Sequence, residues 1–104
     1  MAKENLIRKK AVDILEKDGW IAWVPPRIKY YQTDVFGIID VLAWRGNKQK
    51  NIQLTTLPNV SAKRKKIINF LKKHKIEQSV EIWSWDNRRK RFRKEKIKIK
   101  IKRA

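Results

Sequence analysis

The order in which hydrophobic periodicity changes along the chain is the feature that most constrains its fold. Residues 3–17 repeat apolar side chains, Ile14 among them, at the spacing of one buried helix face, with Gly19 positioned to end the helix. Residues 61–75 repeat that spacing. Three short apolar segments between them, at 20–24, 35–44 and 51–56, are typical of strands, and we expect Trp20, Trp23 and Trp44 of these segments in the core. Because strands lie before and after a crossover helix, we expect an α/β domain with a mixed β-sheet.

The last quarter of the chain indicates further strands. Residues 80–85 alternate in the way of a strand, with Ile82 on the face opposite Trp83 and Trp85. Residues 96–102 alternate lysine with isoleucine, as expected of an edge strand protected by its charges. The 104 residues suffice for one modest core, so we expect a single domain over 1–104, with a basic strand or tail at 88–104.

A large positive charge accompanies this pattern. The formal net charge is +18, and the second part of the chain, residues 61–104, holds 18 basic and 4 acidic side chains. Such a surplus repels itself in a small domain, which favours a polyanionic partner, above all nucleic acid. A basic amphipathic membrane helix is the competing interpretation, but neither a wide apolar face nor a membrane span is evident. The chain has no cysteine, which excludes disulfides and thiol catalysis, and we expect a cytoplasmic protein.

Two basic clusters are the candidate nucleic-acid contacts. One belongs to the second helix and the other follows the turn at residues 86–87. Their members are Lys63, Arg64, Lys65, Lys66, Arg88, Arg89, Lys90, Arg91 and Arg93. No helix-turn-helix, zinc-finger or aromatic RNA-binding motif accompanies them, so we expect contacts to the phosphate backbone rather than to base edges.

Asp40 is the most unusual single residue, because it stands inside an apolar strand segment. An acid in a buried strand is unfavourable unless it is paired, hydrogen-bonded or bound to a metal ion. If Trp44 lies opposite Asn51 in a hairpin, Asp40 lies across from Thr55, and Gln53 shares the same face. An ordinary buried acid, hydrogen-bonded to Thr55 or to backbone amides, remains the alternative to a metal site.

The segments Gly37-Ile38-Ile39-Asp40-Val41-Leu42-Ala43 and Asn51-Ile52-Gln53-Leu54-Thr55-Thr56 resemble the motif of the PD-(D/E)XK nucleases, close to the archaeal Holliday junction resolvases. The resemblance covers roughly residues 3–86. It implies a restriction-endonuclease-like core with the order α-β-β-β-α-β-β. It also implies a metal-dependent, structure-selective endodeoxyribonuclease that uses Mg²⁺ or Mn²⁺ on branched DNA and acts as a homodimer.

The family's site residues carry over by position. Asp40 takes the place of a metal ligand, Gln53 that of the second acidic ligand, and Thr55 that of the catalytic lysine. Glu4 matches the early glutamate of the resolvase pattern, and Asp34 is a substitute for the missing carboxylate. The missing cation would come from Lys63, Lys65 or Lys29.

Two other functions stay open on the sequence alone. Gln53 and Thr55 favour a catalytically inactive member of the nuclease fold that retains DNA binding, because neither side chain carries the charge that the motif requires. The high isoelectric point and lysine-rich tail are also usual for a small basic RNA-binding protein, although such a protein leaves Asp40 unexplained.

Overall fold

A computed structural model describes residues 2–25, 27–28, 31–32 and 36–101. It is an α/β fold in which a five-stranded mixed sheet has the strand order β1-β4-β5-β6-β7, with β5 and β6 parallel and the other neighbours antiparallel. A separate two-stranded ribbon pairs β2 with β3. The helices and strands are α1 (Ala2–Lys17), β1 (Ile21–Trp23), β2 (Arg27–Ile28), β3 (Tyr31–Gln32), β4 (Val41–Arg45), β5 (Lys48–Thr56), the 3-10 turn η1 (Leu57–Asn59), α2 (Val60–His74), β6 (Val80–Asp86) and β7 (Arg91–Ile97).

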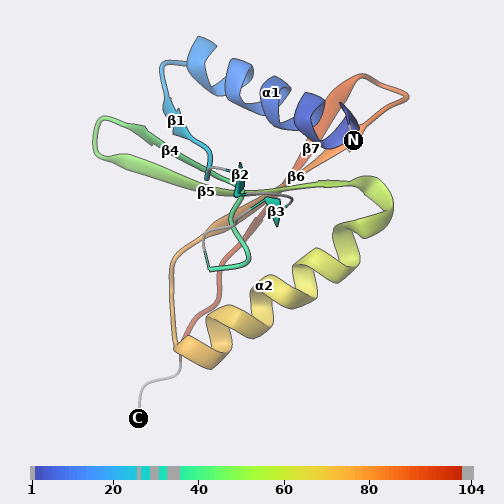
Figure 1. Ribbon diagram of the computed structural model, residues 1–104. Coiled ribbons are helices and arrows are strands. Elements are labelled where there is room, and N and C mark those ends of the chain that lie inside the picture. Colours follow the sequence, from blue (N-terminus) through green and yellow to red (C-terminus); the bar gives the residue numbers. More distant parts are fainter. Residues whose placement is uncertain (1, 26, 29–30, 33–35, 102–104) are drawn as a thin grey trace.

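The two helices lie on opposite faces of the sheet, as Figure 1 shows. Two separate apolar clusters join them to it. On the α1 face, Ala11 and Leu15 of the helix pack with Val41, Ile52 and Trp83 of the sheet. The predicted α/β order with a mixed sheet between two helices is therefore confirmed.

On the α2 face, Ile67 and Leu71 of the helix pack with Val80, Ile82 and Ile97. Ile82 and Trp83 are neighbours in sequence and belong to different clusters, so β6 is buried on both sides. A strand covered on both faces fixes the relative positions of the strands beside it. The α2 face of β5, β6 and β7 is thus a rigid platform for polar residues.

Both helices end where the sequence permits a left-handed residue. Gly19 has a φ of +85° after α1, and the Trp20 amide returns to the Leu15 carbonyl at 2.9 Å. Lys75 has a φ of +53° and closes α2, because its backbone N–H donates hydrogen bonds to the carbonyls of Leu71 and Lys72. The predicted end of the first helix at Gly19 is confirmed. Ile14, which was expected on its buried stripe, is 41% exposed, because the burial of this helix is centred on Ala11 and Leu15.

The β4–β5 hairpin corrects the predicted register. Its turn contains only Gly46 and Asn47, since Arg45 pairs with Lys48, and Trp44 therefore lies opposite Gln49 rather than Asn51. Gly46 has a φ of +60°, as a tight two-residue hairpin requires at its first central position. Strand β4 also begins later than predicted. Asp40 lies in the bend immediately before it and not in its interior.

The C-terminal strand differs from its prediction. Strand β7 spans Arg91–Ile97, whereas residues 98–101 of the predicted alternating strand at 96–102 have no regular secondary structure. Asp86 Oδ1 accepts hydrogen bonds from the backbone amides of Arg88 and Arg89 at 3.1 Å each, which turns the chain back and starts β7 early. Strand β7 ends at Ile97 because this residue pairs with Val80, the first residue of β6. Among the described helices, none has the length and apolar character needed to cross a bilayer.

Candidate nucleic-acid interface and polar site

Asp40 is held by groups from two other parts of the chain. Its Oδ2 accepts hydrogen bonds from Gln53 Nε2 at 2.6 Å and from the Leu54 amide at 2.8 Å. The Asp40 amide bonds to the Ile52 carbonyl at 2.8 Å, and its Oδ1 lies 4.0 Å from an Arg8 guanidinium nitrogen on α1. The carboxylate is therefore buried, hydrogen-bonded and close to the Arg8 guanidinium.

Two polar atoms around this carboxylate have no hydrogen-bond partner among the described residues. They are Gln53 Oε1, in a residue that is 2% exposed, and Arg8 Nε. A buried acceptor without a donor destabilises the fold unless something else occupies its neighbourhood. The Asp40–Gln53 pair is thus the one buried polar site in the described chain where an acceptor oxygen stays unused.

The strand register extends this site across the sheet in two rungs, which are rows of residues that neighbour one another on adjacent strands. Gln53 neighbours Ile82, which neighbours Glu95. Two positions further along β5, and so on the same face, Thr55 neighbours Ser84, which neighbours Arg93. Both rungs face α2, because Ile82 belongs to the cluster beneath that helix. Adjacent strands are about 4.8 Å apart, so Arg93 and Glu95 lie two strands from β5.

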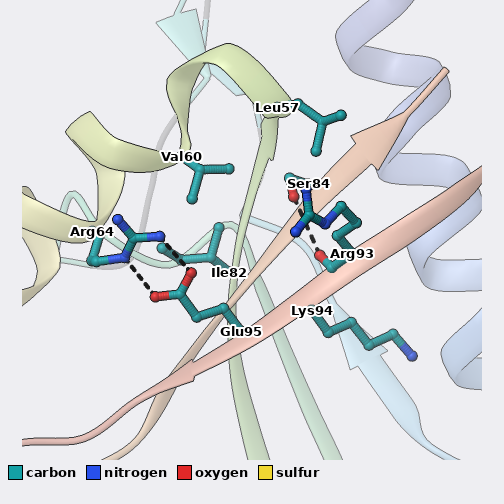
Figure 2. Close-up of a pocket in the computed structure, with 8 residues that line it drawn as sticks. All are labelled: Leu57, Val60, Arg64, Ile82, Ser84, Arg93, Lys94 and Glu95. Carbon is teal, nitrogen blue, oxygen red and sulfur yellow. Dashed lines mark hydrogen bonds and ion pairs between the residues drawn. The ribbon is translucent and has the colours of Figure 1, made fainter. Parts of the chain in front are cut away.

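A cavity of about 400 Å³ opens beside the two rungs, and we call it the α2-side pocket. Figure 2 shows Arg64 reaching down from α2 to Glu95 on β7, with Arg93 extending across Ser84 and Lys94 pointing away. Lys94 instead places its Nζ over the Trp83 ring on the opposite sheet face. The lining residues are Leu57, Val60, Arg64, Ile82, Ser84, Arg93, Lys94 and Glu95.

The charges of the α2-side pocket are partly paired. Glu95 accepts from Arg64 Nε at 2.6 Å and from Arg64 Nη2 at 2.7 Å, a bidentate ion pair between α2 and β7. The Arg64 hydrogen bond, aided by the charges of Arg64 and Arg93, holds the pKa of Glu95 below its ordinary value. Glu95 in turn raises the pKa of Arg64. Both members of the Arg64–Glu95 pair are therefore charged at neutral pH.

A second basic cavity of about 400 Å³ lies on the α1 face, near the β6–β7 turn, and we call it the α1-side pocket. Trp85 and Phe92 contribute its aromatic wall, with ring centroids 5.1 Å apart, and Lys10 Nζ lies 5.1 Å from the Trp85 centroid. Its other lining residues are Asp13, Ile14, Lys90, Arg91 and Lys94. Cations thus border β7 on both faces of the sheet.

The structure brings only part of the expected site together. Asp40, Gln53 and Thr55 lie on neighbouring positions of one sheet face, although Asp40 lies beside Gln53 and not across from Thr55 as predicted. The Glu4 side chain, Asp34 and Lys29 lie outside the described part. Within the described part, no three His, Cys, Asp or Glu residues are close enough together to hold a metal ion.

The predicted basic residues divide between elements. Lys63, Arg64, Lys65 and Lys66 belong to α2, whereas Arg88, Arg89 and Lys90 form the β6–β7 turn and Arg91 and Arg93 belong to β7. Sequence reasoning missed Arg8 as a neighbour of Asp40 and the Arg64–Glu95 pair. No local signal reports either contact, because their partners are about thirty positions apart in the chain.

No family model and no curated protein matches this sequence.

Proposed function

We propose that the protein binds nucleic acid, DNA above all, through the phosphate backbone. The observation that carries this proposal is the concentration of cations around β7. Seven basic residues and one acid occupy positions 88–96, and this segment borders a basic cavity on each sheet face. Backbone phosphates bind such surfaces because each neutralised phosphate releases condensed counterions.

The structure offers no element suited to reading base edges among the described residues. The basic residues come from a strand, a turn and α2, and α2 is anchored to the sheet by Ile67 and Leu71. Contacts of this kind fix position and orientation on a duplex without reading its sequence. The protein should therefore distinguish nucleic acids by shape and charge density.

Removing the β7 charges tests this proposal. We expect the fourfold variant Arg88→Gln, Arg89→Gln, Arg91→Gln and Arg93→Gln to lose at least a hundredfold in affinity for a 20-base-pair duplex, measured by fluorescence anisotropy at 50 mM salt. The control removes the same charge elsewhere, at Lys9, Lys17, Lys72 and Lys73, and should lose far less. Equal losses in both variants would show that total charge, and not this surface, determines binding.

Metal-dependent cleavage of branched DNA is the second candidate function. The unused Oε1 of buried Gln53, next to the Asp40 carboxylate, favours it. Mg²⁺ needs only one or two carboxylates when substrate phosphates complete its coordination. Asp40 and Gln53 would hold the ion, which would supply Lewis-acid activation of a phosphate. The order of the five-stranded sheet, with β1, β4 and β5 before α2 and β6 and β7 after it, is compatible with the order α-β-β-β-α-β-β that the nuclease resemblance implies, and the β2–β3 ribbon is an addition to that order.

A nicking assay tests the second candidate. Purified protein is incubated with four-way-junction and linear DNA in 10 mM Mg²⁺ or Mn²⁺, beside the Asp40→Asn variant. The asparagine side chain keeps an acceptor oxygen and removes the negative charge. Junction cleavage that is lost in Asp40→Asn supports this candidate, and intact DNA with retained binding leaves a binding protein only.

A further inference from the structure

We propose that the α2-side pocket binds one phosphodiester of the nucleic-acid backbone, and that Arg93 is its principal ligand. The inference rests on the proposed nucleic-acid binding and names the group that this surface recognises. It also gives Arg93 the role of the cation that the nuclease motif would place on β5, where this chain has Thr55.

The net charge of the pocket matches a monoanion. Lys94 also lines the pocket but directs its Nζ to the Trp83 ring on the opposite sheet face, and the remaining charged residues, Arg64, Glu95 and Arg93, together carry +1 because the Arg64–Glu95 pair is internally neutral. A phosphodiester carries one negative charge, so it would neutralise the pocket without leaving a second charge unpaired. Phosphate monoesters and metal-bound phosphates are less well matched.

Arg93 is the available donor in this pocket. Arg64 already directs Nε and Nη2 to Glu95, whereas the Arg93 guanidinium forms no side-chain hydrogen bond or ion pair with the described residues. A guanidinium presents two parallel N–H groups at the spacing of two phosphate oxygens. The apolar walls Leu57 and Val60 reduce screening by water around that contact.

Two further features favour an anion here. Val60, the first residue of α2, lines the cavity, and this helix has no acidic residue in its first turn and no side-chain cap. The Val60 amide itself bonds to the Leu57 carbonyl, so the contribution of this helix end is the partial positive charge of its first turn beside the pocket. The buried Ser84 hydroxyl lies on its floor, where it bonds only weakly to the Arg93 carbonyl, at 3.3 Å.

The rungs of the sheet explain how this pocket relates to Asp40 and Gln53. Ser84 is the direct neighbour of Thr55, and Arg93 is the direct neighbour of Ser84. A phosphate bound by Arg93 would lie along the same sheet face as the Asp40–Gln53 pair, displaced by one rung and by two strands. The pocket would thus place the backbone of a bound strand over the buried polar site.

Single substitutions test the pocket in the intact chain. Arg93→Gln should weaken duplex binding at least tenfold and lower the magnitude of the salt slope, d log K/d log [salt], by about 1. Arg93 is exposed, so the variant should fold normally. Arg93→Lys keeps the charge but loses the bidentate geometry and should show an intermediate affinity with an unchanged slope. Lys73→Gln, at the far end of α2, is the charge-matched control.

Glu95→Gln provides a test with the opposite sign. Removing this carboxylate frees the Arg64 charge, so the affinity for duplex DNA should increase at least threefold. The control Glu16→Gln on α1 changes the net charge by the same amount and should increase the affinity less. A purely structural role of Glu95 would instead weaken binding or leave it unchanged, and either result overturns the pocket as assigned.

A minimal ligand separates the pocket from the rest of the surface. The dinucleotide dTpdT contains one phosphodiester, and its titration should shift the Arg93 Nε–Hε signal and the Ser84 and Glu95 backbone amide signals in a ¹H–¹⁵N spectrum of wild-type protein. In Arg93→Gln the same two backbone amides should show no saturable shift. If an acidic peptide shifts the Arg93 signal equally at the same concentration, the site is not selective for phosphate and the assignment fails.

Failure of this inference is distinguishable from failure of the proposed function. If wild type binds duplex DNA and Arg93→Gln has the same affinity as Lys73→Gln, the inference fails while nucleic-acid binding stands. If the wild-type protein binds no duplex DNA, both fail.

Discussion

Replacing Asp40 by alanine should destabilise the fold by about 3 kcal/mol, whereas Asp40→Asn should cost only about 1 kcal/mol. The carboxylate accepts hydrogen bonds from Gln53 Nε2 and from the Leu54 amide, and Gln53 is 2% exposed. Each buried donor left without an acceptor costs about 1 to 3 kcal/mol. In the alanine variant the Gln53 side chain can rotate and so recover part of this cost. The total cost of the two unsatisfied donors therefore falls in the lower half of the range for two such groups.

The Asp40→Asn variant differs because Gln53 has an unused acceptor. The introduced amide keeps an oxygen for the Leu54 amide, and Gln53 can accept from the new NH₂ group through Oε1 once its own amide flips. Urea unfolding at pH 7, followed by circular dichroism, measures both values from the shift in midpoint at constant m-value. A loss below about 1 kcal/mol for Asp40→Ala, or equal losses for the two variants, would refute the hydrogen-bonding account of this carboxylate.

Two further predictions concern stability. Trp83→Ala should lose about 3 to 5 kcal/mol in urea unfolding because Trp83 is 1% exposed in the α1-face cluster, whereas Trp44→Ala, at a 62% exposed position, should change stability by less than about 0.5 kcal/mol; similar effects would contradict the burial pattern. Burial would raise the pKa of Glu81, but hydrogen bonds from Trp83 and Lys50, with the Lys50 and Lys96 charges, lower it overall. The stabilisation of the fold by ionised Glu81 is therefore complete above pH 4.5, the ordinary pKa of this side chain, and is lost as the pH falls through the lower pKa of the folded state. Glu81→Gln should accordingly flatten the acid limb of the stability profile, and an unchanged limb would count against this pairing.

The sequence predicts the order of elements well because periodicity depends on local burial. It also places Gln53 on the face of Asp40, although the expected register was wrong: Asp40 lies beside Gln53 and not Thr55. A hairpin that shifts by two residues keeps every side chain on its face, so alternation alone cannot distinguish the two pairings. The two-residue turn at Gly46 decides between them.

Burial at the sheet edge was harder to predict. Trp23 and Trp44 were expected in the core and are 51% and 62% exposed, because they lie at the β1 side of the sheet. An apolar residue on a strand indicates burial only if another layer covers that part of the sheet. The Arg64–Glu95 pair depends in the same way on α2 crossing β7, which no local pattern specifies.

The salt dependence of duplex binding tests the central claim most directly. Wild-type affinity for a 20-base-pair DNA, measured by anisotropy from 50 to 300 mM salt, should give a linear plot of log K against log [salt]. Contact with four or more phosphates predicts a slope of about −3.6 or steeper. A slope near zero, or no binding at 50 mM salt, would contradict recognition of the phosphate backbone by the β7 surface.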